Sequence, residues 1–462
     1  MDGAGRRWCN CPVFAWLPAF VALGAVAVAL IVGPGDDGAT PPLRVGTESA
    51  AVPLSAQDAP ESADAAPPTA TDAAEVDPPP GPPPLPIALD VWPVALEDGR
   101  VDAVAVRGDR LYVAVQTVAQ RPLIDPAIVR VHALDAAGAE DGRPWRAAIL
   151  GPSPVALAAS GGDVVAIWSH RAHPGRELAT TRIGAGADAG FEVLAAEGAF
   201  TPVGQPLIAP AADDGFLACA NNAAGAPRCV ALDDDGSARW SEISALRRYT
   251  LWRLVPNGAG YFLFGTDCGR EGWGDAEVSA VSCRTPRVVL QELDATGRPR
   301  GRLRWIARFQ GNRELGVIGL GDEVMLYGRR AVAQESTALL IGRRAVKELD
   351  GRWNRTAGGL GDAGGALLLE VDKLHMEDGL PVAGYRPRRW SPGDGRVAPE
   401  GWPEGVASRL PHGLEQRLVA ANEVIAVLDP PTSDGVRGVA LRLHPGASGL
   451  AQAAQPAPNA RP

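Results

Sequence analysis

Four cysteines form two pairs whose placement suits disulfide chemistry. Cys219 and Cys229 flank one short segment, and Cys268 and Cys283 flank another. A zinc site would need Cys-x-x-Cys spacing and neighbouring histidines, and the sequence provides neither around these residues. The spacing therefore predicts two disulfides, each stabilising by about 2–3 kcal/mol through loop closure, and an oxidising compartment.

Other candidate reactive residues are few. His170 and His173 could ligate a metal from the loop SHRAHPG, but no third ligand is near, so a solvated loop is favoured. The run Asp233 to Asp235 lacks the alternating spacing of a calcium loop. No Gly-x-Ser-x-Gly, phosphate-loop or His-Glu-x-x-His motif occurs. Carboxylate pairs for glycoside hydrolysis can be assembled from any chain this acidic, so they indicate nothing. We expect no catalytic residues, no metal and no cofactor.

The amino terminus predicts a membrane anchor. Residues Val13 to Val32 are twenty uncharged residues, enough for a helix to span a bilayer. Arg6 and Arg7 precede this stretch, and Asp36 and Asp37 follow it. The positive-inside rule then predicts a cytoplasmic tail at 1–12, containing the unpaired thiols Cys9 and Cys11. The remainder would lie in the periplasm of a bacterium or outside its cell. A cleaved signal peptide is the alternative, although its apolar region is usually shorter.

Two segments have compositions that cannot form a core. Residues 33–86 contain fourteen prolines, no aromatic residue and nine acidic residues against Arg44, which predicts a disordered, partly polyproline spacer. Residues 447–462 are rich in Ala, Pro and Gln and predict a disordered tail. Because the spacer carries most of the net charge of -10, the rest of the chain is nearly neutral. A nucleic-acid partner is therefore not expected.

Between these segments, a pattern of two apolar arms around a tight-turn pair recurs seven times. Each copy predicts a β-hairpin, because the central Gly, Asp and Asn residues tolerate positive φ angles. The copies begin at Val101, Val155, Pro206, Trp252, Glu314, Gly359 and Gln416.

A second sequence motif follows some of these hairpins. Asp135, Asp233 and Asp294 each stand three residues before a glycine, which predicts a turn between two further strands. The last strands would carry a tryptophan at equivalent places. These tryptophans are Trp145, Trp240 and Trp305, with Trp353 and Trp402 in weaker copies. Four antiparallel strands repeated seven times predict an all-β, seven-bladed β-propeller over residues 87–446.

The two ends of the array predict how the ring closes. The seventh unit reaches a third strand at Gly438 to Gly446 and lacks a fourth. An extra strand, Pro86 to Leu96, carries Trp92 where the fourth strands carry theirs. We expect this amino-terminal strand to complete the last blade, which would remove exposed sheet edges. The alternative is an unrelated edge segment.

The repeats resemble those of exported bacterial propeller proteins, many of them uncharacterised. The likeness rests on second strands such as VVAIWS and on the DAxG turns. ALDDDGSARW is also similar to repeats of quinone-dependent dehydrogenases and of the propeller scaffold in outer-membrane protein assembly. Those relatives have eight blades, and the Asp-to-Gly spacing here is one residue shorter, so the resemblance does not imply a quinone site.

Function is expected on one face of the ring. Loops joining second to third strands share that face, and loops on rigid scaffolds commonly carry binding. The candidate binding residues in or beside these loops are Arg121, Asp125, His170, Arg171, His173, Trp273, Arg329, Arg330 and His375. The sequence predicts a non-catalytic binding or scaffolding module for an envelope protein or polysaccharide. The alternative is an extracytoplasmic enzyme that acts on a glycan or small molecule at the central channel.

Overall fold

The computed structural model describes residues between 89 and 443. Within that range the undescribed positions are 98, 118–126, 150–153, 172–175, 184–189, 197–199, 212, 224, 234–236, 259, 268–285, 311–314, 332–335, 351–352, 354–355, 363–364, 372–374, 378–379, 383, 393–396, 400–401, 403–405, 408–409, 411–416, 422 and 430–434. The chain divides into two compact units, Met1–Pro78 and Pro79–Pro462, and every described residue belongs to the second. Among the described residues, no helix is both long and apolar enough to cross a bilayer. The predicted anchor at 13–32, the spacer at 33–86 and the tail at 447–462 lie outside the described residues.

The described chain forms seven four-stranded antiparallel sheets. The first is β2 (Arg100–Arg107), β3 (Arg110–Gln116), β4 (Ala127–Leu134) and β5 (Trp145–Ile149). The second is β6 (Ala156–Ser160), β7 (Asp163–Arg171), β8 (Arg176–Ile183) and β9 (Glu192–Leu194). The third is β10 (Pro202–Pro210), β11 (Phe216–Asn222), β12 (Arg228–Leu232) and β13 (Ala238–Glu242), followed by the short helix η1 (Ser244–Leu246). The fourth is β14 (Thr250–Pro256), β15 (Gly260–Thr266), β16 (Arg287–Asp294) and β17 (Pro299–Arg308).

The remaining sheets complete the series. The fifth is β18 (Gly316–Leu320), β19 (Glu323–Arg329), β20 (Ser336–Ile341) and β21 (Val346–Leu349). The sixth is β22 (Thr356–Asp362), β23 (Gly365–Val371), β26 (Tyr385–Trp390) and β27 (Val397–Pro399), with a separate pair, β24 (His375–Glu377) and β25 (Leu380–Val382), in its middle connection. The seventh is β28 (Arg417–Ala420), β29 (Val424–Leu428), β30 (Val436–Leu443) and β1 (Leu89–Leu96).

The predicted turns connect neighbouring strands of the sheets. The first hairpin of each sheet closes at the predicted turn, for example Arg107 opposite Arg110 with Gly108 at φ 61°. In the second motif the aspartate stabilises the turn, because Asp135 Oδ1 accepts hydrogen bonds of 2.9 Å from the N–H groups of Ala137 and Ala139. Gly138 then takes the left-handed φ of 79°. Asp294 and Gly297 repeat this arrangement.

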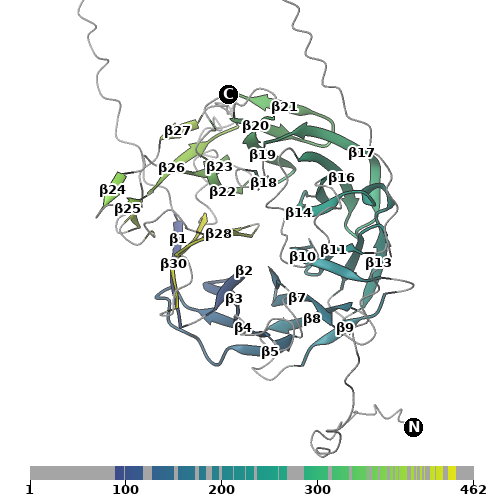
Figure 1. Ribbon diagram of the computed structural model, residues 1–462, viewed down its shortest axis with the longest axis horizontal. Helices are drawn as coiled ribbons and strands as arrows, with labels where there is room; N and C mark the ends of the chain where they lie inside the picture. The colour runs from purple at the N-terminus through teal and green to yellow at the C-terminus, as the bar shows by residue number, and fades with distance from the viewer. Residues whose placement is uncertain are drawn as a thin grey trace, which may run out of the picture. The chain divides into compact units, whose positions relative to one another are not determined.

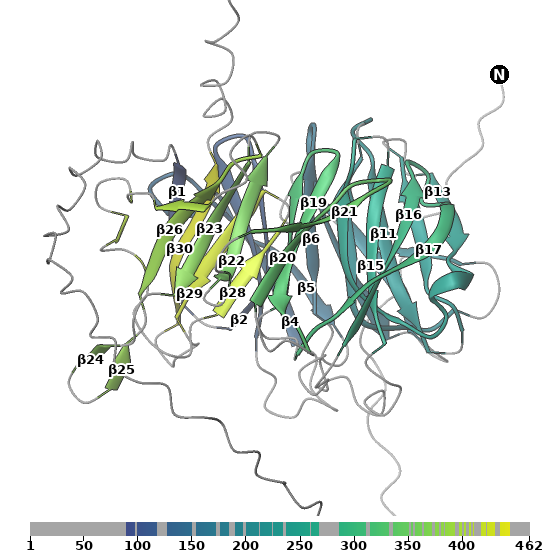
Figure 2. The same cartoon turned by 90° about the horizontal axis from the view of Figure 1, so that it is seen from above.

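The sheets are arranged in a closed ring with their first strands toward its centre (Figure 1). Their innermost strands are neighbours in the order β2, β6, β10, β14, β18, β22, β28 and again β2. Seen from the side, the strands run between two faces of the ring, where the connections lie (Figure 2). The protein is therefore a seven-bladed β-propeller, as predicted.

The amino-terminal strand closes the ring, which confirms the prediction. β1 pairs antiparallel with β30 along its whole length, with Val91 opposite Leu441 and Trp92 opposite Ala440. The Trp92 indole is buried and its Nε1–H donates to the Asp109 carbonyl at 3.0 Å. Arg442 of β30 forms an ion pair of 2.7 Å with Asp90 and lies over the Trp92 ring. One seventh of the ring thus depends on contacts between opposite ends of the chain.

The core is divided among the interfaces between blades. Apolar side chains on both faces of each sheet pack against the neighbouring sheets in seven clusters of described residues. Polar side chains also join adjacent blades. Ser169 donates to the Pro202 carbonyl, and Asn221 accepts the Leu251 N–H at 2.8 Å. No blade is covered on both faces without its neighbours, which is why the sequence repeats.

Two tryptophans depart from the prediction. Trp145, Trp240 and Trp305 lie on the fourth strands β5, β13 and β17, as expected. Trp353 and Trp402 do not, because β21 and β27 are short and end before them. Trp353 is nevertheless buried, and Trp402 Nε1–H donates to the Tyr385 carbonyl at 2.9 Å. The pattern identified tryptophans that pack near the outer strands but misplaced two of them in the sheet.

Candidate functional site: the central channel and a basic rim

One disulfide is confirmed, and it lies in strands. Cys219 of β11 is directly opposite Cys229 of β12, and their sulfurs are bonded. The two residues are fully buried in the third blade, so the bond joins the second and third strands. Cys268 and Cys283 lie outside the described residues, between β15 and β16, and their pairing stays a prediction.

The central channel contains a cavity of about 350 Å³. Its walls come from β2, β6, β10, β14 and β28, each of which is the inner edge of its sheet. Small apolar side chains line much of it, including Ala103, Ala105, Ala156 and Ala158. Edge strands also leave backbone N–H and C=O groups without ladder partners, so polar groups are available between these side chains. The cavity is of the size that binds small molecules.

One carboxylate on the cavity wall already has protein partners. Asp102 is buried, forms an ion pair of 3.0 Å with Arg100 and accepts the Val155 N–H at 3.3 Å. The second of these bonds joins the first blade to the second. Asp102 therefore links the inner strand of the first blade to the start of the second blade.

Arg253 is different, because it lies inside the channel without a carboxylate partner. It belongs to β14 of the fourth blade, and its Nη1 donates to the Ala420 carbonyl of β28, in the seventh blade, at 2.8 Å. No ion pair joins it to a described residue, and its buried Nε has no hydrogen-bond partner. Burial lowers the pKa of the Arg253 guanidinium, an effect that the nearby Tyr327 hydroxyl opposes. A cation thus crosses the channel with most of its five N–H donors uncommitted.

A signal for Arg253 was present in the sequence. Counted back from the hairpin turns, the equivalent positions in other blades are Ala103, Ala156, Gly316 and Gly358. Arg417 occupies the same place in the seventh blade, so the fourth and seventh blades carry an arginine where these four blades carry a small residue. The β-ladder shifts register between Leu251 and Arg253, and such bulges redirect side chains. Sequence reasoning missed this residue because it placed function on the loops.

A second cavity, of about 360 Å³, lies at the end of the channel where the first hairpins of the first three blades turn; we call this the hairpin end. Arg107, Glu423 and Arg442 provide its charged groups. Desolvation of the Glu423 carboxyl raises its pKa, and the charge of Arg442 acts in the opposite direction. Arg442 is already bound to Asp90 and to the Gly108 carbonyl, so this cavity adjoins the ring closure.

The predicted loop-face residues are only partly described. Arg121, Asp125, His173 and Trp273 lie outside the described residues. Arg171 ends β7 and His375 begins β24, but their side chains are not described. His170 lies in β7, with its ring 4.9 Å from that of Phe191 and its buried Nδ1 without a hydrogen-bond partner.

The last two of these residues lie together at the end of the fifth blade. Arg329 is the final residue of β19, and Arg330 forms an ion pair of 2.7 Å with Glu348. The predicted binding role of the loop-face residues remains a prediction. A metal site at His170 also stays without support, since no three His, Cys, Asp or Glu side chains of the described chain gather into a possible site.

The outer edges of the fourth and fifth blades form a basic rim, which the sequence analysis did not identify. It is defined by exposed cations on β17 with the turn before it, and on the β20–β21 turn with the start of β21. These cations are Arg298, Arg300, Arg302, Arg343, Arg344 and Lys347. No ion pair joins any of them to a described carboxylate. The rim is strongly positive although the chain has a net charge of -10.

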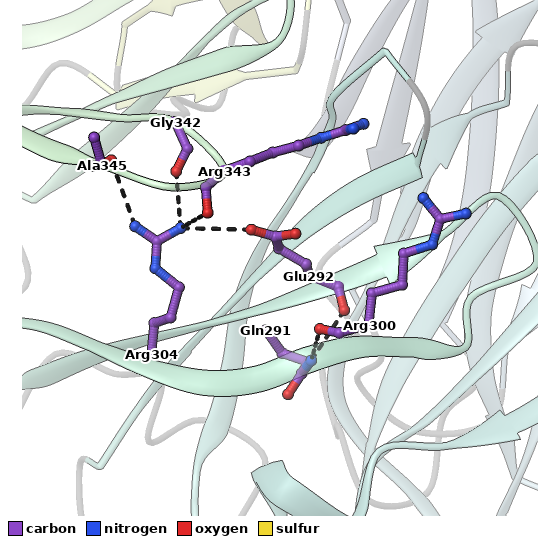
Figure 3. Close-up of polar contacts among 7 residues, drawn as sticks. All are labelled: Gln291, Glu292, Arg300, Arg304, Gly342, Arg343 and Ala345. Atoms are coloured by element: carbon purple, nitrogen blue, oxygen red, sulfur yellow. Dashed lines mark hydrogen bonds and ion pairs between the residues drawn. The ribbon is translucent and has the colours of Figure 1, made fainter.

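Arg304 holds the two halves of the basic rim together (Figure 3). Its guanidinium donates to the Gly342 carbonyl at 2.8 Å and to the Arg343 carbonyl at 3.0 Å, and pairs with Glu292 at 3.5 Å. In the same view the side chains of Arg300 and Arg343 extend away from these contacts. Arg304 is therefore structural, whereas its neighbours are free to meet a partner.

Two exposed apolar side chains accompany the basic rim. Trp305 on β17 is 63% exposed and Val346 on β21 is 45% exposed. β17 is the outermost strand of its blade, so its outer edge pairs with no described strand. Trp145, on the equivalent strand of the first blade, is buried. The shared pattern predicted the strand position of both tryptophans but not the exposure of Trp305.

Comparison with known proteins gives similarity of fold. No protein-family model and no curated protein matches the chain. Among solved structures, the β-propeller domain of the Trilobed protease from Pyrococcus furiosus is 8% identical, with a TM-score of 0.42 over 75% of this chain and 96% of that one. An ulvan lyase of a new polysaccharide lyase family is 11% identical, with a TM-score of 0.46 over 75% and 93%. A puromycin-hydrolyzing peptidase of Mycobacterium tuberculosis is 16% identical, with a TM-score of 0.41 over 77% and 56%. Similarity at this level carries no argument about activity.

Proposed function

We propose that this propeller is a non-catalytic binding module that captures an acidic segment of a cell-envelope protein at the basic rim. The observation that carries the proposal is Trp305, an exposed tryptophan on the edge strand that also carries the exposed Arg300 and Arg302. Tryptophan and arginine are the residue types most enriched in the energetic centres of protein interfaces. An extended segment could also pair with the free backbone edge of β17.

The charge of the basic rim specifies the chemistry of the partner. Six exposed cations without ion-pair partners favour a segment rich in Asp and Glu, because arginine binds carboxylates in a bidentate manner. Such an interface forms quickly at low salt and weakens as ionic strength rises.

The same proposal places the propeller outside the cytoplasm, tethered to the bacterial cytoplasmic membrane through Val13 to Val32. The charges that flank this segment favour that orientation. The Cys219–Cys229 disulfide supports it, because such bonds persist mainly in oxidising compartments. A membrane-impermeant maleimide tests the topology. It should label Cys9 and Cys11 only after the cytoplasmic membrane is opened, whereas a cysteine replacing the exposed Val193 should be labelled once the outer barrier is permeable.

Site-specific photocrosslinking of the full chain in intact cells tests the binding proposal. A photoreactive amino acid replaces Trp305, and in a second strain it replaces Val193. Val193 is a matched control, because it is 41% exposed on β9, the outermost strand of the second blade. We expect a discrete adduct at position 305 whose crosslinked peptide is rich in Asp and Glu. The double substitution Arg300→Glu with Arg302→Glu should abolish it.

Three outcomes contradict the proposal. The first is the same adduct at both positions, and the second is a peptide without acidic residues. The third is a polydisperse adduct that a glycan-degrading enzyme removes, which would identify a polysaccharide instead of a protein partner.

A further inference from the structure

We propose that the central channel binds a small organic monoanion with an apolar body, whose carboxylate pairs with Arg253. This site is separate from the basic rim and goes beyond the proposed capture of a protein segment. It rests on the position of one cation, on the walls around it and on the charges that face it.

Arg253 is a partly buried charge that no described carboxylate neutralises. Its Nη1 bond to the Ala420 carbonyl satisfies one donor, while Nε is buried without a partner. A charge removed from water costs free energy unless an opposite charge or several hydrogen bonds compensate it. The lowered pKa of the guanidinium has the same cause. An anion that enters the cavity would supply the missing compensation.

The neighbouring groups do not fill this role. Asp102, the other buried charge on the wall, is occupied by Arg100 and the Val155 N–H. Tyr327 is the group that interacts electrostatically with Arg253. Its ring fits over Gly316, where a Cβ atom would come within 2.1 Å of it. Tyr327 packs in the core between the fifth and sixth blades and is not among the described residues that line the cavity.

The walls define the remainder of the ligand. Ala103, Ala105, Ala156 and Ala158, with Val419, give the cavity apolar patches on the side of the first, second and seventh blades, beside backbone polar groups of the same inner strands. These residues suit a hydrocarbon or aromatic body and offer no further cation. Glu423 at the hairpin end of the cavity would repel a second negative charge. The combination favours a monocarboxylate over a dicarboxylate or a phosphate ester.

Isothermal titration of the full chain with four probes tests the proposal: octanoate, benzoate, inorganic phosphate and octylammonium. We expect octanoate or benzoate to bind with one site per chain, and octylammonium not to bind. Arg253→Met should weaken carboxylate binding at least about tenfold, because a charge-assisted hydrogen bond is lost. Arg253→Lys, which keeps the charge but not the planar fork, should weaken it less. Arg146→Met, on the exposed face of β5 and outside both proposed sites, is the matched control and should leave the affinity unchanged.

Circular dichroism and a thermal unfolding curve establish that each variant is folded. Should Arg253→Met fail to fold, a structure of the unaltered protein with the bound carboxylate decides the question, because its oxygens must lie within hydrogen-bond distance of Arg253. The proposal is overturned if neither carboxylate binds or if octylammonium binds equally well. It is also overturned if Arg253→Met keeps full affinity or if the carboxylate lies elsewhere. Loss of the rim adduct in the Arg300 and Arg302 variants bears on the proposed function alone, so the two ideas fail separately.

Discussion

Replacement of Trp92 by alanine should destabilise the whole propeller, because this side chain joins the first strand to the last blade. The Trp92 side chain is 2% exposed and packs in the cluster that joins the seventh and first blades. Burial of an indole of about 200 Å² at about 25 cal/mol/Å² contributes about 5 kcal/mol, an upper bound. The lost hydrogen bond to Asp109 adds about 1 kcal/mol, and partial collapse of the cavity offsets some of the total. We expect a net loss of about 3–5 kcal/mol.

Urea unfolding followed by circular dichroism measures this loss. With a slope of about 3 kcal/mol/M, the midpoint should fall by about 1–1.7 M. Trp305→Ala is the matched control, because Trp305 is a tryptophan on an outer strand but is 63% exposed. Its free energy of unfolding should change by less than about 0.5 kcal/mol. Equal shifts for the two variants, or no shift for Trp92→Ala, would refute the reasoning.

Three further predictions follow from other contacts. Replacing Cys219 and Cys229 by alanine should lower the free energy of unfolding by about 2.7 kcal/mol, from closure of a loop with a sequence separation of 10, and reductant should destabilise the natural chain by at least that amount. Arg304→Met should cost about 1–3 kcal/mol in urea unfolding, because carbonyls of the β20–β21 turn and the Glu292 carboxylate lose their donor, whereas Arg302→Met on the same strand should cost almost nothing. The pKa of Glu423 is raised in the folded state, so its contribution to folding stability is most favourable below the ordinary value of 4.5 and declines as pH rises through the folded value. Glu423→Gln should therefore match the natural chain in stability at low pH and exceed it at neutral pH. The opposite trend in thermal unfolding midpoints would contradict this.

The sequence predicted the elements whose causes are local. Gly108 and the aspartates Asp135 and Asp294 fix turns through φ angles and short-range hydrogen bonds, so they can be recognised from a few residues. Ring closure was also predictable, because a surplus strand at one end matched a missing strand at the other. Trp353 and Trp402 were misplaced because β21 ends at Leu349 and β27 at Pro399, before the tryptophans, and the local pattern does not set where a strand ends.

The candidate sites were harder to predict because they depend on long-range geometry. Arg253 and the Ala420 carbonyl are separated by 167 residues, and only the closed ring brings them together. The exposure of Trp305 depends likewise on how far the neighbouring outer strands extend. A comparison of equivalent positions among the repeats would have drawn attention to Arg253 and Arg417, since the small residues Ala103 and Ala156 occupy their place in the first two blades.

Hydrogen–deuterium exchange of β1 tests the closure of the ring most directly. The pairing of Leu89–Leu96 with β30 predicts that the β1 amides that donate to β30 exchange as slowly as those of Val424–Leu428 in β29, the strand on the other side of β30. Both sets should become faster together in Trp92→Ala. Exchange of the 89–96 amides within seconds while β29 stays protected would contradict a ring closed by the amino-terminal strand.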